Sequence, residues 1–248
     1  MSVSRFPLLC TALAQYHTDH VLVWQHGSLL HRYDRVPESP QPQFSVAKSF
    51  TGTAVGFALE EGLLSMNTRA ADFFAEELPP DPCEELRELT LSDLLSMRVG
   101  QKQPQLMGAQ RKTLKETDWI SYVLAQPFDS RPGTSFLYSN TGPYLAAIML
   151  ERASGLSLVD YLMPRLFEPL DIPRPDWDPD PAGHVFGAGG LVMTSSDLLK
   201  FGRLYLADGV WEGQQLLPES WIRAVRETDI PAGADGGGYS LLFWRSRH

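Results

Sequence analysis

The strand-forming segments of this chain lie at its two ends, and the segments between them have helical patterns. Near the amino end, the apolar stretches 20–25 and 28–33 flank the pair His26-Gly27, which predicts a β-hairpin. Near the other end, Gly236-Gly-Gly238 leads into a strand predicted over 239–244. Strands from both ends can form one sheet when the chain between them folds as an insertion. We therefore expect an α/β (α+β) fold with an antiparallel sheet built from both chain ends, flanking helices and an inserted all-helical subdomain.

The expected helices are marked by apolar residues at helical spacing and by capping residues at their ends. They cover residues 6–14, 45–62, 90–97, 118–125, 143–153, 158–166, 195–205 and 219–227. Proline-rich loops at 37–42 and 171–182 flank the helical middle of the chain. These boundaries predict a sheet-containing α/β part formed by 1–44 and 186–248, and a helical subdomain formed by 45–185.

The composition excludes several classes of function. Of the 248 residues, 43% are hydrophobic and 21% are charged, which is ordinary globular usage and excludes disorder of the whole chain. The formal net charge of −9 argues against a general binder of nucleic acid or anionic membranes, since both need a basic face. The longest apolar stretches are far shorter than the roughly 20 residues that span a bilayer, so we expect no membrane span. Two cysteines without a Cys/His cluster at zinc spacing predict no structural metal, and we expect no cofactor.

The amino-terminal segment 6–14 bears on the cellular location. It is mostly apolar and ends in the cleavage-like triplet Ala12-Leu13-Ala14, but Arg5 is its only positive charge. Cleavage after this triplet would come too early for a normal signal peptide. We therefore interpret the segment as an amphipathic first helix and expect a cytoplasmic protein, with export as the alternative.

Ser45 and Lys48 form a Ser-x-x-Lys motif at the start of an apolar helix pattern. Positions i and i+3 lie on one helix face, so the amine can reach the hydroxyl. Burial and the positive end of the helix dipole lower the proton affinity of such a lysine, which can then activate the serine as a nucleophile. The backbone N–H of Ser45 could supply half of an oxyanion hole. With 20 Ser and 5 Lys in the chain, about 0.4 such motifs arise by chance, so a plain N-capping serine is an equal alternative.

The motif Tyr138-Ser139-Asn140 is rarer, since 8 Tyr and 2 Asn give roughly 0.06 Tyr-x-Asn motifs by chance. It lies on an expected loop before a helix, where functional side chains are common. The phenol could shuttle the serine proton if it lies near Lys48, and Asn140 could hold both the lysine and a substrate amide. The alternative is a turn tyrosine followed by an asparagine that caps the next helix.

Together, Ser45-Val-Ala-Lys48-Ser-Phe50 and Tyr138-Ser-Asn140 resemble the motifs of the serine β-lactamase and penicillin-binding-protein superfamily. Tyrosine in the second motif is typical of the class C branch, with its esterase, D-aminopeptidase and amide-oligomer hydrolase relatives. Leu94-Leu-Ser-Met97, Arg131-Pro-Gly-Thr134 and the stretch 187–197 extend the resemblance along most of the chain.

The resemblance implies a serine hydrolase that forms an acyl-enzyme from an ester, an amide or a β-lactam. Ser45 would be the acylated nucleophile, Lys48 and Tyr138 the proton-transfer pair, and Asn140 a contact for the substrate and the lysine. Its partner would be a small-molecule or peptide-like acyl substrate, and its oligomeric state stays open. The alternative is a non-catalytic or truncated relative that binds a ligand or partner through the same pocket.

The third motif of the family, Lys-Thr-Gly or a His/Tyr-containing substitute, is missing from this sequence. In the family it lies on a strand beyond the position that matches Trp244 and supplies the second oxyanion donor, and this chain ends at His248. We therefore expect a truncated chain, an incomplete sheet with an uncovered edge, and hydrolysis impaired by about 10²–10³-fold. Gly187–Gly190 should bring backbone close to the pocket or pack tightly rather than replace the motif. The loops 101–117 and 171–186 should form the pocket walls.

Overall fold

The computed structural model describes residues 6–13, 15–233 and 237–246. Its helical elements are α1 (Pro7–Leu13), η1 (Phe44–Val46), α2 (Ala47–Glu60), α3 (Ala70–Phe73), α4 (Glu84–Glu88), α5 (Leu91–Leu95), α6 (Gly108–Arg111), α7 (Trp119–Leu124), α8 (Thr141–Ser154), α9 (Leu158–Leu162), η2 (Met163–Phe167), α10 (Ser195–Leu206) and α11 (Glu219–Glu227). Its strands are β1 (His20–Gln25), β2 (Ser28–Asp34), β3 (Gln41–Pro42), β4 (Asp176–Trp177), β5 (Leu191–Met193), β6 (Val210–Trp211), β7 (Gln214–Gln215), β8 (Ile230–Pro231), β9 (Gly238–Tyr239) and β10 (Trp244–Arg245). Each expected helix corresponds to a helical segment at its expected place, and the short helices α3, α4 and α6 are additional.

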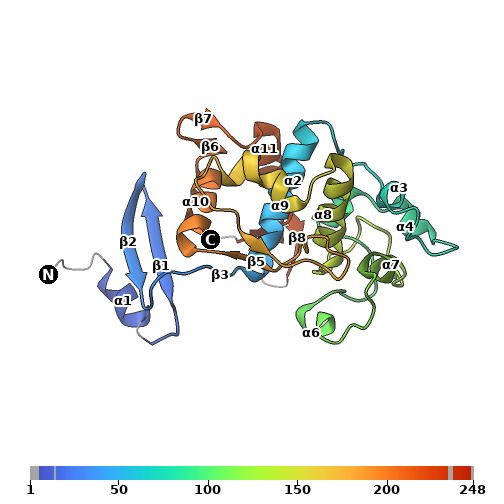
Figure 1. The fold of residues 1–248 in the computed structure, drawn as a ribbon, viewed down its shortest axis with the longest axis horizontal. Helices are drawn as coiled ribbons and strands as arrows, with labels where there is room; N and C mark the ends of the chain where they lie inside the picture. Colours follow the sequence, from blue (N-terminus) through green and yellow to red (C-terminus); the bar gives the residue numbers. More distant parts are fainter. Residues whose placement is uncertain (1–5, 14, 234–236, 247–248) are drawn as a thin grey trace.

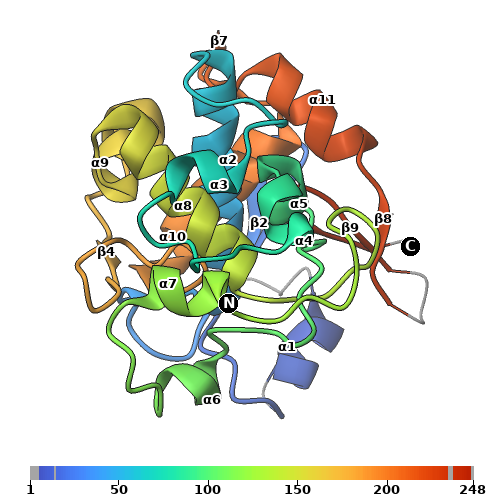
Figure 2. The same ribbon diagram turned by 90° about the vertical axis from the view of Figure 1, so that its right-hand side faces the viewer.

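The helices are arranged around α2 and α8, which lie side by side at the centre of the molecule (Figures 1 and 2). Helix α5 packs against α8, α11 packs against α2, and α9 contacts both central helices. The β1–β2 hairpin stands at one end of the long axis, and α3 and α4 lie at the other end (Figure 1). Among the described helices, none combines the length and the apolar character needed to cross a bilayer.

Helix α2 is buried along nearly its whole length, as its apolar and small side chains predict. On one face, the ring of Phe50 stacks on Phe201 with the ring centres 3.9 Å apart. On another face, Gly56 lets Trp221 approach so closely that a Cβ at residue 56 would lie 2.5 Å from the indole ring. Dense packing on several faces therefore fixes α2, and with it the residues at its amino end.

In the described part of the chain, the strands form four small antiparallel sheets, β1–β2, β3–β5–β4, β6–β7 and β8–β9–β10. This confirms the mixed α/β fold class. The predicted hairpin is present, and its turn residues His26 and Gly27 have φ angles of 49° and 77°. However, the hairpin shares no ladder with the described strands of the other chain end, so one sheet from both ends is not formed. The hairpin packs on α10 instead, where the Arg203 guanidinium lies 3.8 Å from the ring centre of Trp24 and 4.7 Å from that of Trp211.

The prediction of one continuous strand over 239–244 is wrong. This segment forms two short strands, β9 and β10, which pair with each other as a tight hairpin. The turn holds Leu241 and Leu242, both 2% exposed, and Leu242 has a positive φ of 65°. The N–H of Leu242 donates to the carbonyl oxygen of Leu95 over 3.0 Å, which ties the turn to α5. Burial of two leucines against the helices thus outweighs the strand propensity of the segment. In the preceding glycine run, Gly236 lies outside the described residues.

Candidate active site

Ser45 and Lys48 lie next to each other where the chain enters its central helix. Ser45 belongs to η1 and is exposed, whereas Lys48 lies in the first turn of α2 and is only 1% exposed. The Nζ of Lys48 donates to the Oγ of Ser45 over 3.1 Å and to the carbonyl oxygen of Ala188 over 2.6 Å. The i, i+3 spacing therefore brings the amine to the hydroxyl, as the sequence predicts.

Burial gives the Lys48 amine unusual acid–base properties. The charged form is disfavoured because the amine is removed from water, and the positive charge of Arg111 disfavours it further. Together these effects lower the pKa of Lys48 from its ordinary 10.5 to about 7. A lysine with this pKa is partly neutral at neutral pH and can accept a proton.

The loop 187–190 forms the inner wall behind Lys48. Besides the contact through Ala188, the carbonyl oxygen of Gly187 accepts a hydrogen bond from the Thr51 hydroxyl over 2.7 Å. A Cβ at residue 187 would lie 2.6 Å from the Cβ of Ala147, so only glycine fits here without displacement. The glycine-rich stretch thus packs tightly and brings its backbone to the candidate site, which confirms the expectation for it.

The residue before Ser45 has an unfavourable backbone conformation. Phe44 has a φ of 46°, in the left-handed region that a bulky side chain rarely adopts, and its side chain is 77% exposed. The preceding N–H, of Gln43, donates to the carbonyl oxygen of Leu191 over 2.8 Å and continues the β3–β5 pairing. This pairing holds the chain at the point where it turns into η1, directly before the exposed Ser45.

The ring of Tyr138 lies near the Lys48 amine. The Nζ of Lys48 is 5.1 Å from the centre of the tyrosine ring. The ring stacks on Trp244 at 5.4 Å and meets the edge of Tyr239 at 6.1 Å. The structure therefore brings the Lys48 amine close to both the Ser45 hydroxyl and the ring of Tyr138, which is distant in sequence from the other two.

Asn140 does not make the expected contact with the lysine. Its Nδ2 donates to the carbonyl oxygen of Leu106 over 2.7 Å, and the described hydrogen bonds of the Lys48 amine go to Ser45 and Ala188. The side chain of Asn140 does not cap α8 either, so that alternative is also not realised. Its Oδ1 atom is buried and has no hydrogen-bond partner. The reason is the loop before Leu106, which folds back over Asn140 and takes its amide group.

The same loop supports the rest of the Tyr138-Ser139-Asn140 segment. The N–H of Gln105 donates to the Ser139 Oγ over 3.0 Å, and the Gln105 side chain accepts from the Tyr122 hydroxyl over 3.0 Å. These contacts are buried or partly buried, so they fix the backbone that carries Tyr138. The loop 101–106 therefore holds the segment Tyr138-Ser139-Asn140 in position through hydrogen bonds from residues distant in the sequence.

Sequence reasoning missed three groups around the site. Ala188 contributes only its backbone oxygen, which no side-chain pattern can reveal, and the nearby glycines were the one available signal. Gln105 and Arg111 fall within the loop expected to form a pocket wall, but nothing in their local sequence distinguishes them. For Trp119 and Trp177 we expect a place in the core rather than in a hydrophobic acyl site, and this is confirmed because each is 8% exposed and packs in the core.

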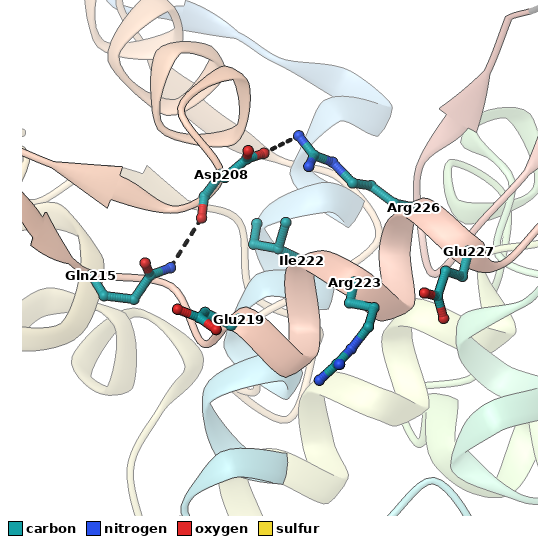
Figure 3. A pocket seen from close by; sticks show the side chains of 7 residues that line it. All are labelled: Asp208, Gln215, Glu219, Ile222, Arg223, Arg226 and Glu227. Atoms are coloured by element: carbon teal, nitrogen blue, oxygen red, sulfur yellow. Dashed lines mark hydrogen bonds and ion pairs between the residues drawn. The ribbon is translucent and has the colours of Figure 1, made fainter.

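The cavity drawn in Figure 3 lies apart from these residues. Its lining consists of Asp208, Gln215, Glu219, Ile222, Arg223, Arg226 and Glu227. Asp208 forms an ion pair with Arg226, and its backbone oxygen accepts from Gln215 over 3.0 Å. Since none of the candidate site residues lines this cavity, we assign it no role in the chemistry. Within residues 6–13, 15–233 and 237–246, no group of three or more His, Cys, Asp or Glu side chains could hold a metal ion.

Comparisons with solved structures define the fold. The structure superposes on a Bacillus anthracis protein with the provisional name 6-aminohexanoate-dimer hydrolase, with a TM-score of 0.81 and 22% identity, over 95% of this chain and 67% of that chain. It also superposes on the octameric penicillin-binding protein homologue from Pyrococcus abyssi, with a TM-score of 0.74 and 20% identity, over 98% of this chain and 65% of that chain. These likenesses confirm a β-lactamase-type fold.

The chain belongs to the β-lactamase family, whose model matches residues 11–245. It is 26% identical over 265 aligned positions to the 6-aminohexanoate-dimer hydrolase of Paenarthrobacter ureafaciens, covering 97% of this chain and 67% of that protein. It is 27% identical over 260 positions to penicillin-binding protein 4 of Amycolatopsis lactamdurans, covering 88% of this chain and 67% of that protein. The chain thus spans about two thirds of the length of these relatives and is a member of a hydrolase family.

Proposed function

We propose that the chain is a serine hydrolase that forms an acyl-enzyme at Ser45 from an ester, an amide or a β-lactam. The observation that carries this proposal is the 3.1 Å hydrogen bond between the buried Lys48 amine and the exposed Ser45 hydroxyl. A hydroxyl in contact with a largely desolvated amine can lose its proton as it attacks a carbonyl carbon. Membership of a hydrolase family supports the same conclusion.

In the proposed reaction, neutral Lys48 accepts the proton of Ser45 while the serine oxygen bonds to the carbonyl carbon. The tetrahedral intermediate then collapses, and the leaving oxygen or nitrogen takes up a proton. We assign this proton transfer to Tyr138 together with Lys48, because the tyrosine ring lies 5.1 Å from the lysine Nζ. Water then attacks the acyl-serine, and the serine regains its proton.

The backbone N–H of Ser45 is the proposed first oxyanion donor. Ser45 lies in the first turn of a helical segment, where N–H groups have no acceptor within the helix.

Covalent labelling tests the proposal directly. The chain is incubated with a fluorophosphonate or with a fluorescent penicillin, and the adduct is located by intact mass and peptide mapping. The names of two relatives refer to a 6-aminohexanoate dimer and to penicillin, which supports small-molecule or peptide-like acyl compounds as substrates. We expect one adduct on Ser45, none on Ser45→Ala, and normal labelling of Ser28→Ala, a control in the exposed turn-side end of β2. A wild-type chain that takes no label contradicts the proposal.

A binding role without catalysis is the second candidate. Phe44 and Val46, on either side of Ser45, are 77% and 39% exposed, so apolar side chains that a bound ligand could contact lie next to the Ser45 hydroxyl. On this alternative, penicillin binds reversibly and leaves no adduct. Equilibrium dialysis with labelled penicillin, followed by denaturation, separates bound ligand from covalent product.

A further inference from the structure

Another cavity lies between the amino-terminal hairpin and α10. Its volume is about 690 Å³. This size is typical of small-molecule sites, which measure roughly 300–1,000 Å³. Its lining includes Trp24 of β1, Arg203 and Leu206 of α10, and Val210 and Trp211 of β6. The hairpin packs beside α10 (Figure 1). Since none of the candidate site residues lines the cavity, the proposed hydrolysis gives it no role.

The guanidinium of Arg203 is a cation of this cavity without an anionic partner. Its central carbon lies 3.8 Å from the ring centre of Trp24 and 4.7 Å from that of Trp211. Within the described residues, this half-buried guanidinium forms no ion pair and no hydrogen bond, whereas Arg32 and Arg226 each bind a carboxylate. Acidic side chains outnumber basic ones by 30 to 21 in this chain, so a lack of carboxylates does not explain why Arg203 has none.

The two indole rings hold the guanidinium in a position that suits an anion. Contacts with aromatic rings use the flat faces of a guanidinium, whereas its N–H groups donate hydrogen bonds in its plane. The rings themselves are carried by paired strands, since Trp24 pairs with Leu29 and Trp211 with Gln214. A guanidinium that is already held in place loses little freedom when it binds a ligand. Arg203 is therefore prepared to bind an anion.

The rest of the lining indicates which anion fits. Leu206 is 69% exposed and Val210 is half-buried, so apolar surface continues from the indole rings. The other titratable side chains of the lining are His26 and Glu212. The carboxylate of Glu212 and the net charge of −9 disfavour a ligand with two negative charges. A carboxylate carries one charge and matches a guanidinium through two parallel hydrogen bonds.

We propose that this cavity binds a small organic carboxylate that carries an apolar ring or chain. The carboxylate pairs with Arg203, and the apolar part lies against Trp24, Trp211 and Leu206. Glu212 restricts the ligand to a single negative charge. This binding function goes beyond the hydrolase function and does not depend on it, because the two sites share no residue.

Calorimetry on the full chain tests the proposal with 3-phenylpropionate as the ligand. Its amide has the same shape without the charge, and propionate has the charge without the ring. We expect each of these two compounds to bind about tenfold to hundredfold more weakly, because one lacks the ionic pairing and the other lacks the apolar contacts. The indole N–H signals of Trp24 and Trp211 in NMR spectra should shift on binding, which places the ligand in the cavity.

Substitutions of Arg203 test its pairing with the carboxylate. Arg203→Gln should weaken the binding of 3-phenylpropionate by about tenfold to hundredfold and leave the binding of the amide unchanged. Arg203→Lys should restore part of the affinity, because it keeps the charge but not the paired hydrogen bonds. The matched control is Arg223→Gln, which removes an exposed arginine of α11 that forms no ion pair within the described residues. The control should bind as the wild type does, and all three variants should label normally at Ser45.

Glu212→Gln tests the restriction to one charge without changing the stacked guanidinium. Glu212 is exposed in the turn that joins β6 and β7, so its replacement leaves the fold intact. The wild type should bind 3-phenylpropionate more tightly than benzylsuccinate, which is the same compound with a second carboxylate. In Glu212→Gln this preference should narrow by about twofold to fivefold.

Several outcomes overturn the proposal. One is that 3-phenylpropionate and its amide bind equally well, or that neither binds. Another is that Arg203→Gln weakens both compounds equally, or no more than Arg223→Gln does, because Arg203 then serves only to hold the hairpin on α10. If circular dichroism shows that Arg203→Gln does not fold, Glu212→Gln decides, and an unchanged preference for the single charge overturns the proposal.

Discussion

The two flanks of Ser45 are built in different ways. On the inner flank, Lys48 and Thr51 are buried, and both bind carbonyl oxygens of the loop 187–190. On the outer flank, the wall consists of aromatic rings, Tyr138 stacked on Trp244, and Trp244 is 58% exposed. The inner flank is closed to water, and the outer flank is open to it.

This difference separates two tasks. Control of a proton needs a low-dielectric position, and one helix turn packed on one tight loop provides it here. Recognition of a substrate needs a surface that ligands can reach, and here it is assembled from segments that are distant in the chain. The following predictions test the division, beginning with the largest expected effect.

Replacing Lys48 with methionine should remove the function of the inner flank and leave the fold intact. Methionine fills a similar volume but carries no amine, so acylation should slow by about 10²–10⁴-fold, the usual contribution of a general base. The rate of labelling by fluorescent penicillin measures the effect, and circular dichroism checks the fold. The exposed Lys102→Met should label normally. A Lys48→Met chain that labels within threefold of the wild type contradicts the assignment.

The pH profile should report the buried amine. Only neutral Lys48 can accept the serine proton, so kcat/KM should fall about tenfold per pH unit as the pH drops below its pKa of about 7. In the unfolded chain the Lys48 amine has its ordinary pKa of 10.5, so it keeps a proton that the folded chain loses above about pH 7. The free energy of unfolding of the wild type, relative to that of Lys48→Met, should therefore rise between about pH 7 and 10.5. Ester hydrolysis and urea unfolding at several pH values measure the two effects. If kcat/KM does not change from pH 5 to 8, a group other than Lys48 accepts the proton of Ser45.

Gly187→Ala should destabilise the inner flank by crowding. The new Cβ would lie 2.6 Å from the Cβ of Ala147, and overpacking of this kind costs about 1–3 kcal/mol. Urea denaturation measures the loss. Gly202→Ala is the matched control, because residue 202 lies in α10 and a Cβ added there would have no neighbouring atom within 4 Å. This variant should stabilise the chain by about 0.5–1 kcal/mol, since alanine favours a helix more than glycine does. If the two variants are equally stable, the loop 187–190 can move aside to accommodate the added methyl group, and the contradicted claim is that its packing is tight.

Trp244→Ala should have the smallest effect, because it acts on the open flank. Loss of the stack on Tyr138 removes about 0.5–1.5 kcal/mol of ring contact, which corresponds to a twofold to tenfold lower acylation rate. Trp211→Ala, at the Arg203 contact far along α10, should leave acylation unchanged. A loss as large as that of Lys48→Met would show that the outer flank takes part in the proton transfer.

The inner flank could be predicted from sequence because its key contact is local. The spacing of Ser45 and Lys48 on one helix is enough to place the amine against the hydroxyl. Burial of Lys48 also followed from the small and apolar residues on every face of the helix. The contact with Ala188 did not follow, because it depends on where a loop 140 residues later in the chain comes to lie.

The outer flank could not be predicted to the same degree. Asn140 was expected to contact Lys48, but its side-chain amide instead donates a hydrogen bond to the carbonyl oxygen of Leu106. The strand expected over 239–244 became two, because the buried turn at Leu241 and Leu242 gains more from packing than a straight strand would. Such outcomes depend on tertiary contacts that no local pattern of residues contains.

The close approach of Trp221 to Gly56 has a consequence for synthesis. This contact joins residues 165 positions apart, and the turn at Leu241 closes over the same helix next to Gly52. While the nascent chain is still emerging from the ribosome, α2 has one side without its cover until Trp221 and Leu241 have been made. Contacts of such long sequence separation slow folding, so α2 should reach its final packing late in folding.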